Sequence, residues 1–175
     1  ADGASWFVSD LQNEGKVVSA RWMAAGLGVF ELYVNGQRVG NEFLKPGFTH
    51  NQKTKYSFTY DITEAVKTGS GAENVFAAQV TPGWWADKIV TPGNHDGMVG
   101  KKCAFRSVVE LVYADGTVRH YGTDLDNWKA GIAGPVTHAA IFDGEFYDAR
   151  IAPGYETPEK LSTPEENKEF PGKIF

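Results

Sequence analysis

The chain of 175 residues carries 17 Lys and Arg against 22 Asp and Glu, so its formal net charge is −5. This balance excludes the basic face that binding to nucleic-acid phosphates requires, and no apolar run reaches the roughly 18–20 residues of a membrane span. With 42% hydrophobic residues, the chain has the composition of a soluble globular protein. Its only cysteine is Cys103, which excludes an internal disulfide and a cysteine-based zinc site.

Short strands are predicted along most of the chain. The 20 glycines, together with 5 Trp, 7 Tyr and 11 Phe, are typical of strands joined by tight turns. Strands are expected at 5–11, 16–25, 28–34, 37–43, 54–60, 74–80, 102–114, 117–122, 128–132, 137–142 and 146–151. One helical turn is expected at 61–66, capped by Asp61 or Thr63. The pattern indicates an all-β protein, a jelly-roll β-sandwich with short helical turns.

The alternation of side chains indicates which strand faces are buried. Phe30, Leu32 and Val34 share one face of the third expected strand under the period of two. In the second expected strand, Val18, Ala20 and Trp22 are predicted to share one face in the same way.

Two dipeptides predict hairpin turns. Asn35-Gly36 supplies the positive φ angles that a type I′ turn requires, and Asp115-Gly116 gives a second two-residue signal. The composition changes after Ile151, because 152–175 contains four of the 8 prolines and many Glu and Lys. We therefore expect a β-sandwich domain over 1–151, followed at 152–175 by an extended, irregular tail or linker toward a missing catalytic region. The N-terminal residues show no signal peptide, and the chain is expected to begin within a longer protein.

The segment 81–100 is predicted to be irregular, and loops of this length inside a domain are usually functional. Trp84 and Trp85 follow the core strand at 74–80, and adjacent residues of an extended chain point to opposite sides. One ring can therefore join the core while the other lines a surface. Further along, Asn94 and Asp96 offer oxygen ligands of the kind that calcium takes, although Asn and Asp are also common turn residues.

A cluster of carboxylates lies between 143 and 148. A glycosidase needs two carboxylates on either side of the scissile bond, and Asp143 and Glu145 would share one face of an extended strand. The alternative is that these are surface and turn residues, with Asp148 paired to Arg150.

The stretch 27–49, LGVFELYVNGQRVGNEFLKPGFT, resembles the signature of the N-terminal domain of bacterial α-L-rhamnosidases. Further matches follow in the same order, at 60–63, 83–85, 113–117, 122–124, Trp128 and 142–150. The resemblance covers the chain from about residue 16 to residue 151 and is carried by the combination of these pieces.

The resemblance implies a jelly-roll domain that precedes a catalytic (α/α) barrel, which holds the catalytic carboxylates and is absent here. It also implies that some members bind rhamnose through calcium, with ligands from the loop after a Pro-Gly-Trp-Thr stretch, where an acidic residue is usual. Here Phe48 replaces the Trp, and His50 followed by Asn51 replaces the acidic position. We therefore expect no metal ligand and no cofactor, with calcium as an alternative that needs Asp96 and backbone carbonyls.

The resulting hypothesis is a noncatalytic domain of an α-L-rhamnosidase-like glycoside hydrolase, with no catalytic residue of its own. Its expected partners are carbohydrate, above all terminal L-rhamnose, and the catalytic barrel of the parent enzyme, but no nucleic acid and no membrane. The compartment is left open, with a periplasmic or secreted parent enzyme as one expectation. The expected ligand-binding residues are His50, Asn51, Trp84, Trp85, Asn94 and Asp96.

Two alternatives stay open. One is a purely structural domain without a ligand, which the burial of both Trp84 and Trp85 would favour. The other is a self-sufficient glycosidase that uses Asp143 and Glu145.

Overall fold

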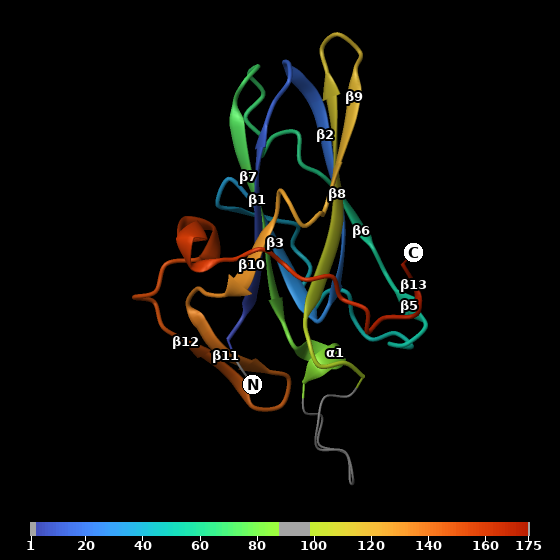
Figure 1. Cartoon of the computed structure of the whole chain (residues 1–175), viewed down its shortest axis with the longest axis vertical. Helices are drawn as coiled ribbons and strands as arrows, with labels where there is room; N and C mark the ends of the chain where they lie inside the picture. Colours follow the sequence, from blue (N-terminus) through green and yellow to red (C-terminus); the bar gives the residue numbers. More distant parts are fainter. Residues whose placement is uncertain (1–2, 88–98, 175) are drawn as a thin grey trace.

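The computed structural model describes residues 3–87 and 99–174, and it consists mainly of two antiparallel sheets packed face to face (Figure 1). One sheet has the order β10 (Lys129–Ile132), β1 (Ser5–Gln12), β7 (Glu73–Thr81), β3 (Val29–Val34) and β4 (Gln37–Val39). The other has the order β6 (Phe58–Asp61), β2 (Val17–Leu27), β8 (Ala104–Tyr113) and β9 (Val118–Gly122). The predicted all-β sandwich is confirmed.

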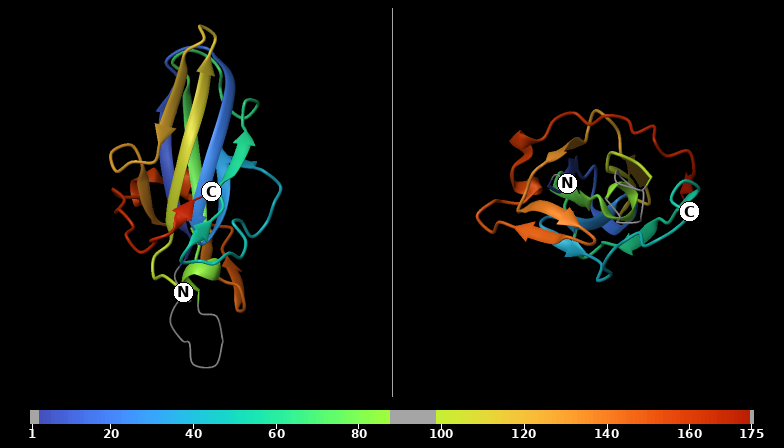
Figure 2. Two further views of the ribbon diagram at one scale, coloured as in Figure 1. Left: turned by 90° about the vertical axis from the view of Figure 1, so that its right-hand side faces the viewer. Right: turned by 90° about the horizontal axis from the view of Figure 1, so that it is seen from below.

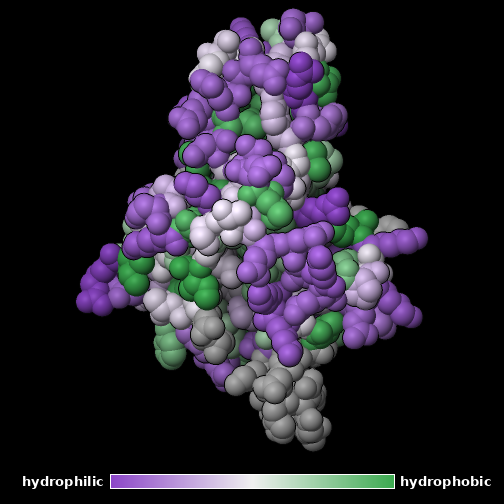
Figure 3. Space-filling view, viewed as in Figure 1, coloured by the Kyte–Doolittle hydropathy of each residue, from purple (hydrophilic) through white to green (hydrophobic). Residues whose placement is uncertain are grey.

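The core lies between the two sheets. Trp22 on β2 meets Phe76 on β7 edge to face, with ring centroids 5.3 Å apart, so one aromatic pair joins both layers. Phe30, Leu32 and Val34 are fully buried, as the alternation along β3 predicts. On the face shown in Figure 3, hydrophilic residues predominate and hydrophobic ones are scattered. Burial of apolar surface between the sheets is therefore the main stabilising term of the fold.

The prediction for Val18 is wrong. The register between β2 and β8 shifts between Val17 and Ser19. At this bulge β2 has one extra residue, which breaks the alternation of its side chains. Val17 consequently enters the core with Trp22, whereas Val18 is 50% exposed.

The turn between β3 and β4 is the predicted one. Asn35 and Gly36 have φ angles of 50° and 79°, as a type I′ turn requires. The return strand is shorter than the expected 37–43, because β4 ends at Val39 and Gly40 follows with a φ of 78°. The chain then leaves the sheet, and Phe43 is 79% exposed.

The segment 54–66 also differs in detail from the prediction. The expected single strand is divided into β5 (Thr54–Lys55) and β6, and the helical turn is one hydrogen-bonded turn in which the amides of Ala65 and Val66 donate to Ile62. Asp61 caps this turn as expected, because its carboxylate accepts hydrogen bonds from the amide and hydroxyl of Thr63.

The remaining elements are short and lie around the sandwich. They are α1 (Gly83–Ala86), the hairpin of β11 (Val136–Ala140) and β12 (Gly144–Tyr147), the 3₁₀ turns η1 (Gly154–Glu156) and η2 (Pro158–Lys160), and β13 (Lys173–Ile174). No helix among the described residues is long and apolar enough to cross a membrane.

The C-terminal segment curves around the lower half of the sandwich from β12 to β13 (Figure 2). Tyr155 and Leu161 pack in a second apolar cluster with Trp6, on the outer side of β1. At the end of the segment, β13 pairs in parallel with β5. The segment thus contacts both sides of the sandwich, and two of these contacts border sites described below.

Candidate functional site

The aromatic pair Trp84-Trp85 lies at one end of the sandwich, at the bottom of Figure 1. The two residues belong to the short helix α1 and not to an extended chain, because Gly83, with a φ of 49°, turns the chain at the end of β7. Successive helical residues point about 100° apart, so the expected separation of the rings still occurs. Trp85 is buried, 1% exposed, while Trp84 is half-buried.

Trp85 is held by contacts from several segments. Its indole nitrogen donates to the carbonyl oxygen of Lys102 over 2.9 Å, and its own carbonyl accepts the amides of Val99 and Gly100. A Cβ at Gly100 would lie 2.2 Å from the indole ring, so only glycine fits there. Phe170 of the C-terminal segment closes the site edge to face, with centroids 6.2 Å apart. Trp85 is therefore a structural residue that fixes α1.

Trp84 lies beside the loop that follows the β3–β4 hairpin. Phe48 of this loop meets the Trp84 ring edge to face, with centroids 5.4 Å apart, and Phe48 is 63% exposed. The side-chain amide of Asn51 donates to the carbonyl oxygen of Trp84 over 3.2 Å. The structure thus places the 48–51 loop and α1 side by side and leaves aromatic surface exposed at their junction. Stacking on such surface is one way in which a protein holds the C–H face of a sugar.

Asn51 and His50 have different environments. Asn51 is buried, and its side-chain oxygen accepts a hydrogen bond from the ammonium group of Lys55. The His50 side chain is exposed, and its backbone carbonyl accepts the amides of Lys53 and Thr54. Both the nitrogen and the oxygen of the Asn51 side-chain amide are therefore used within the chain, and the residue ties the 48–51 loop to Trp84.

Lys55 is the functional candidate that the sequence does not reveal. It is buried, its ammonium nitrogen lies 5.3 Å from the centre of the Trp85 ring, and burial lowers its pKa to about 8. The pattern of β5 and β6 offers no signal for this, because a lysine in an alternating strand is usually expected to face solvent.

These contacts test whether a calcium ion, which the family resemblance implies, would fit. Calcium takes six to eight oxygen ligands, but the Asn51 oxygen faces the positive charge of Lys55 and His50 offers no carboxylate. His50 and Asn51 therefore do not fit a calcium site. Among the described residues, no group of three or more His, Cys, Asp or Glu side chains could hold a metal ion.

Asn94 and Asp96, the remaining expected ligand-binding residues, lie outside the described residues. The described residues that flank this gap, Asp87 and Val99, are both fixed close to Trp85. The amide of Asp87 donates to Gly83 in α1, and that of Val99 donates to the carbonyl of Trp85.

The carboxylates of the β11–β12 hairpin are surface groups. Asp143 lies in the turn and Glu145 on β12, both exposed. Asp148 pairs with Arg150 over 2.6 Å, which lowers the pKa of this carboxyl. Exposed carboxylates on a hairpin lack the walls that would place a sugar between them.

The fold defines a small all-β sandwich domain with an aromatic end. The model of the family described as the α-L-rhamnosidase N-terminal domain matches residues 15–169. The chain therefore belongs to the family of α-L-rhamnosidase N-terminal domains.

Individual relatives agree with this assignment. The chain is 36% identical over 165 residues to an α-L-rhamnosidase of Streptomyces avermitilis, a match that covers 91% of this chain and 15% of the relative. An α-L-rhamnosidase of Alteromonas sp. is 34% identical over 136 residues, covering 77% of this chain and 14% of the relative. The chain thus spans about one seventh of the length of these relatives.

Solved structures show the same fold. The crystal structure of the Streptomyces avermitilis α-L-rhamnosidase complexed with L-rhamnose superposes with a TM-score of 0.78 and 32% identity, over 94% of this chain and 15% of that chain. The native α-L-rhamnosidase of Aspergillus terreus gives a TM-score of 0.79 and 29% identity, over 87% of this chain and 17% of that chain.

Proposed function

We propose that this domain is a noncatalytic carbohydrate-binding part of an α-L-rhamnosidase and binds terminal L-rhamnose at the junction of Trp84 and the 48–51 loop. The observation that supports this most directly is the half-buried Trp84 ring beside the exposed Phe48, with the Trp84 carbonyl bonded by the buried Asn51. The exposed ring faces would take the apolar side of a sugar. His50 and, from the segment after α1, Asn94 and Asp96 would provide hydrogen bonds to its hydroxyls.

The remainder of the parent enzyme, in this proposal, carries the catalytic barrel that hydrolyses terminal α-L-rhamnose. The short share of each relative that this chain covers supports a division of labour between a binding domain and a separate catalytic region. The relative solved with L-rhamnose supports the choice of sugar.

Titration of the ¹⁵N-labelled chain with L-rhamnose tests the binding half of the proposal. We expect amide shifts around Trp84 and His50 with a Kd of roughly 1 mM, about −4 kcal/mol. Trp84→Ala should weaken binding about tenfold, whereas Phe43→Ala, which removes an exposed aromatic ring from the loop after β4, should not. The absence of shifts at tens of millimolar L-rhamnose would instead favour a purely structural domain.

An assay on an aryl α-L-rhamnoside tests the noncatalytic half. We expect no turnover from the chain alone, because Asp143 and Glu145 lie on an exposed hairpin. Turnover that is lost in Asp143→Asn or Glu145→Gln would contradict the proposal and would support the self-sufficient glycosidase.

A further inference from the structure

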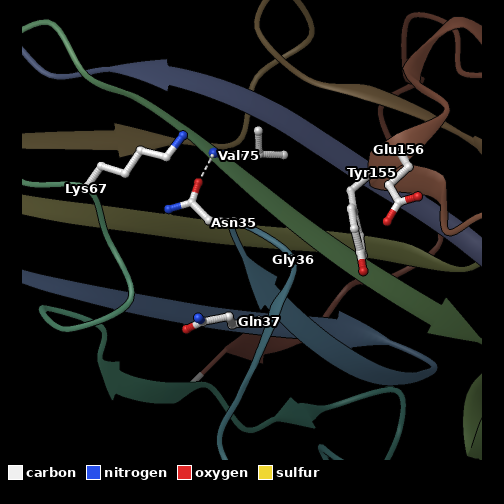
Figure 4. Close-up of a pocket in the computed structure, with 7 residues that line it drawn as sticks. All are labelled: Asn35, Gly36, Gln37, Lys67, Val75, Tyr155 and Glu156. Carbon is white, nitrogen blue, oxygen red and sulfur yellow. Dashed lines mark hydrogen bonds between the residues drawn. The ribbon is translucent and has the colours of Figure 1, made fainter.

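A groove crosses the β3–β4 turn, at the other end of β3 from Trp84. One hollow of about 480 Å³ lies between Lys67 on one side and Tyr155 and Glu156 on the other, with the turn at Asn35-Gly36 between them (Figure 4). A second hollow of about 570 Å³ lies between β4 and the 61–65 turn. Gln37 lines both hollows, so they meet there.

This groove is separate from the site at Trp84. β3 begins at Val29, which pairs with Thr81 just before α1 and lies beside Gly83. The strand runs from there to Asn35, which corresponds to about 20 Å at 3.4 Å per residue. A ligand at the turn end of the groove, beside Asn35 and Tyr155, would therefore be remote from Trp84, although the second hollow reaches back along β4 to Gly40.

The aromatic wall of the groove is held firmly. Tyr155 packs against Trp6 and Tyr33, with ring centroids 5.5 Å and 5.6 Å away. Across the hollow, a Cβ at Gly36 would lie 3.6 Å from the Tyr155 ring, so a larger side chain there would reach this ring. Gly36 has a φ of 79°, so glycine suits this turn, and the partly exposed Tyr155 ring borders the same hollow.

The polar groups of the groove divide into used and unused ones. The Asn35 amide donates to Ala65 and Asn74 and accepts the amide of Val75, so it is part of the framework. The side chains of Gln37, Lys67 and Glu156 are exposed and make no hydrogen bond or ion pair with the described part of the chain. An amide, an ammonium and a carboxylate are therefore available to a ligand.

The charges along the groove are mixed. Two positive side chains, Lys67 and Arg38, and three negative ones, Glu156, Asp61 and Glu64, line it. The charge of Arg38 is further compensated by Glu31, 2.7 Å away. Such a lining disfavours a polyanion, and its exposed donors and acceptors match the hydroxyls of a neutral sugar chain.

We propose that this groove is a second carbohydrate site, which binds a neutral oligosaccharide chain with one sugar ring against Tyr155 and the next ones beyond Gln37. Two hollows of about 480 Å³ and 570 Å³ that share Gln37 have room for more than one sugar ring. This goes beyond the binding of a terminal L-rhamnose at Trp84 and does not depend on it.

NMR titration of the full chain with cellohexaose, xylohexaose, mannohexaose and the acidic hexagalacturonate tests the proposal. We expect at least one neutral hexasaccharide to shift amides of the 35–38 turn, Lys67 and η1 at about 10 mM, above a roughly millimolar Kd. Gln37→Ala and Lys67→Ala should each weaken this binding roughly fivefold, as expected for one lost hydrogen bond.

Matched variants separate this site from the first. Lys160→Ala, an exposed lysine of η2 that does not line the groove, should leave the binding unchanged, and so should Trp84→Ala. No shifts with any neutral hexasaccharide, shifts with hexagalacturonate alone, or shifts that Trp84→Ala abolishes would each overturn the proposal. L-Rhamnose binding at Trp84 is measured independently, so either site can fail without the other.

Discussion

The ammonium group of Lys55 donates a hydrogen bond to the side-chain oxygen of Asn51, and both residues are buried beside Trp85. No carboxylate among the described residues pairs with Lys55. The described groups that face its charge are the Asn51 dipole and the Trp85 ring, which attracts cations. Burial consequently lowers the pKa of Lys55 from 10.5 to about 8.

This buried lysine should make stability rise with pH. Between pH 8 and pH 10.5 the folded chain has released the Lys55 proton while the unfolded chain still binds it. The free energy of unfolding should therefore rise by about 1–3 kcal/mol between pH 8 and pH 10.5 because of Lys55. Urea unfolding at pH 7, 8, 9 and 10 measures this gain as the difference between the wild-type chain and Lys55→Met.

Lys53→Met is the matched control, because Lys53 is a neighbouring exposed lysine. The difference in free energy of unfolding between Lys53→Met and the wild-type chain should stay constant from pH 7 to pH 10. Equal pH dependence in the two variants would show that Lys55 is not buried as a cation.

Calcium should affect neither stability nor sugar binding at Trp84. Lys55 places a positive charge at the Asn51 oxygen, and His50 provides no carboxylate. We expect the same Tm, within the error of a calorimetric scan, in millimolar calcium and after chelation with EDTA. The L-rhamnose titration should likewise be unchanged. A Tm that falls on chelation would indicate a calcium site built from other groups.

The sequence predicts the sandwich well where one residue pattern decides the outcome. Phe30, Leu32 and Val34 alternate strictly and are buried, and Asn35-Gly36 forms the expected turn. The prediction fails at Val18, because a shift of register depends on how β2 pairs with β8 and not on β2 alone.

The candidate site is harder to predict, because its contacts join segments far apart in the chain. A strand pattern does not show that Asn51 will contact Trp84, 33 residues later, and only the family resemblance suggests that the two loops meet. The burial of Lys55 depends on the space beside Trp85, which no local signal encodes. The same holds for the groove, where Tyr155 comes from a segment whose composition predicts a tail.

Asn35 should contribute more to stability than its counterpart in the second hairpin turn. Its side chain bonds Ala65, Asn74 and the amide of Val75, whereas the Asp115 side chain bonds its near neighbour Thr117 at the surface. We expect Asn35→Ala to lower the free energy of unfolding by about 2–4 kcal/mol, and Asp115→Ala by less than about 1 kcal/mol. Urea unfolding of the two variants tests this, and equal losses would contradict the role assigned to Asn35.

Gly154 should decide whether the C-terminal segment stays on the sandwich. A Cβ at this position would lie 2.3 Å from the Trp6 ring, and Trp6 is buried and cannot retreat without opening the cluster with Tyr155 and Leu161. Gly154→Ala should therefore displace the segment and lower the free energy of unfolding by about 1–3 kcal/mol. The peptide bonds around η1 and η2 should then become accessible to proteases.

Limited proteolysis followed by mass spectrometry measures this displacement as faster cleavage after residue 152. Gly69→Ala is the matched control, because a Cβ added at Gly69 would lie 4.0 Å from the side chain of Ala72, without a clash. If Gly154→Ala is cleaved no faster than Gly69→Ala, then Trp6 does not hold the segment. In that case contacts other than those with Trp6 would hold the Tyr155 ring in place. Faster cleavage together with lost hexasaccharide binding would link the segment to the groove.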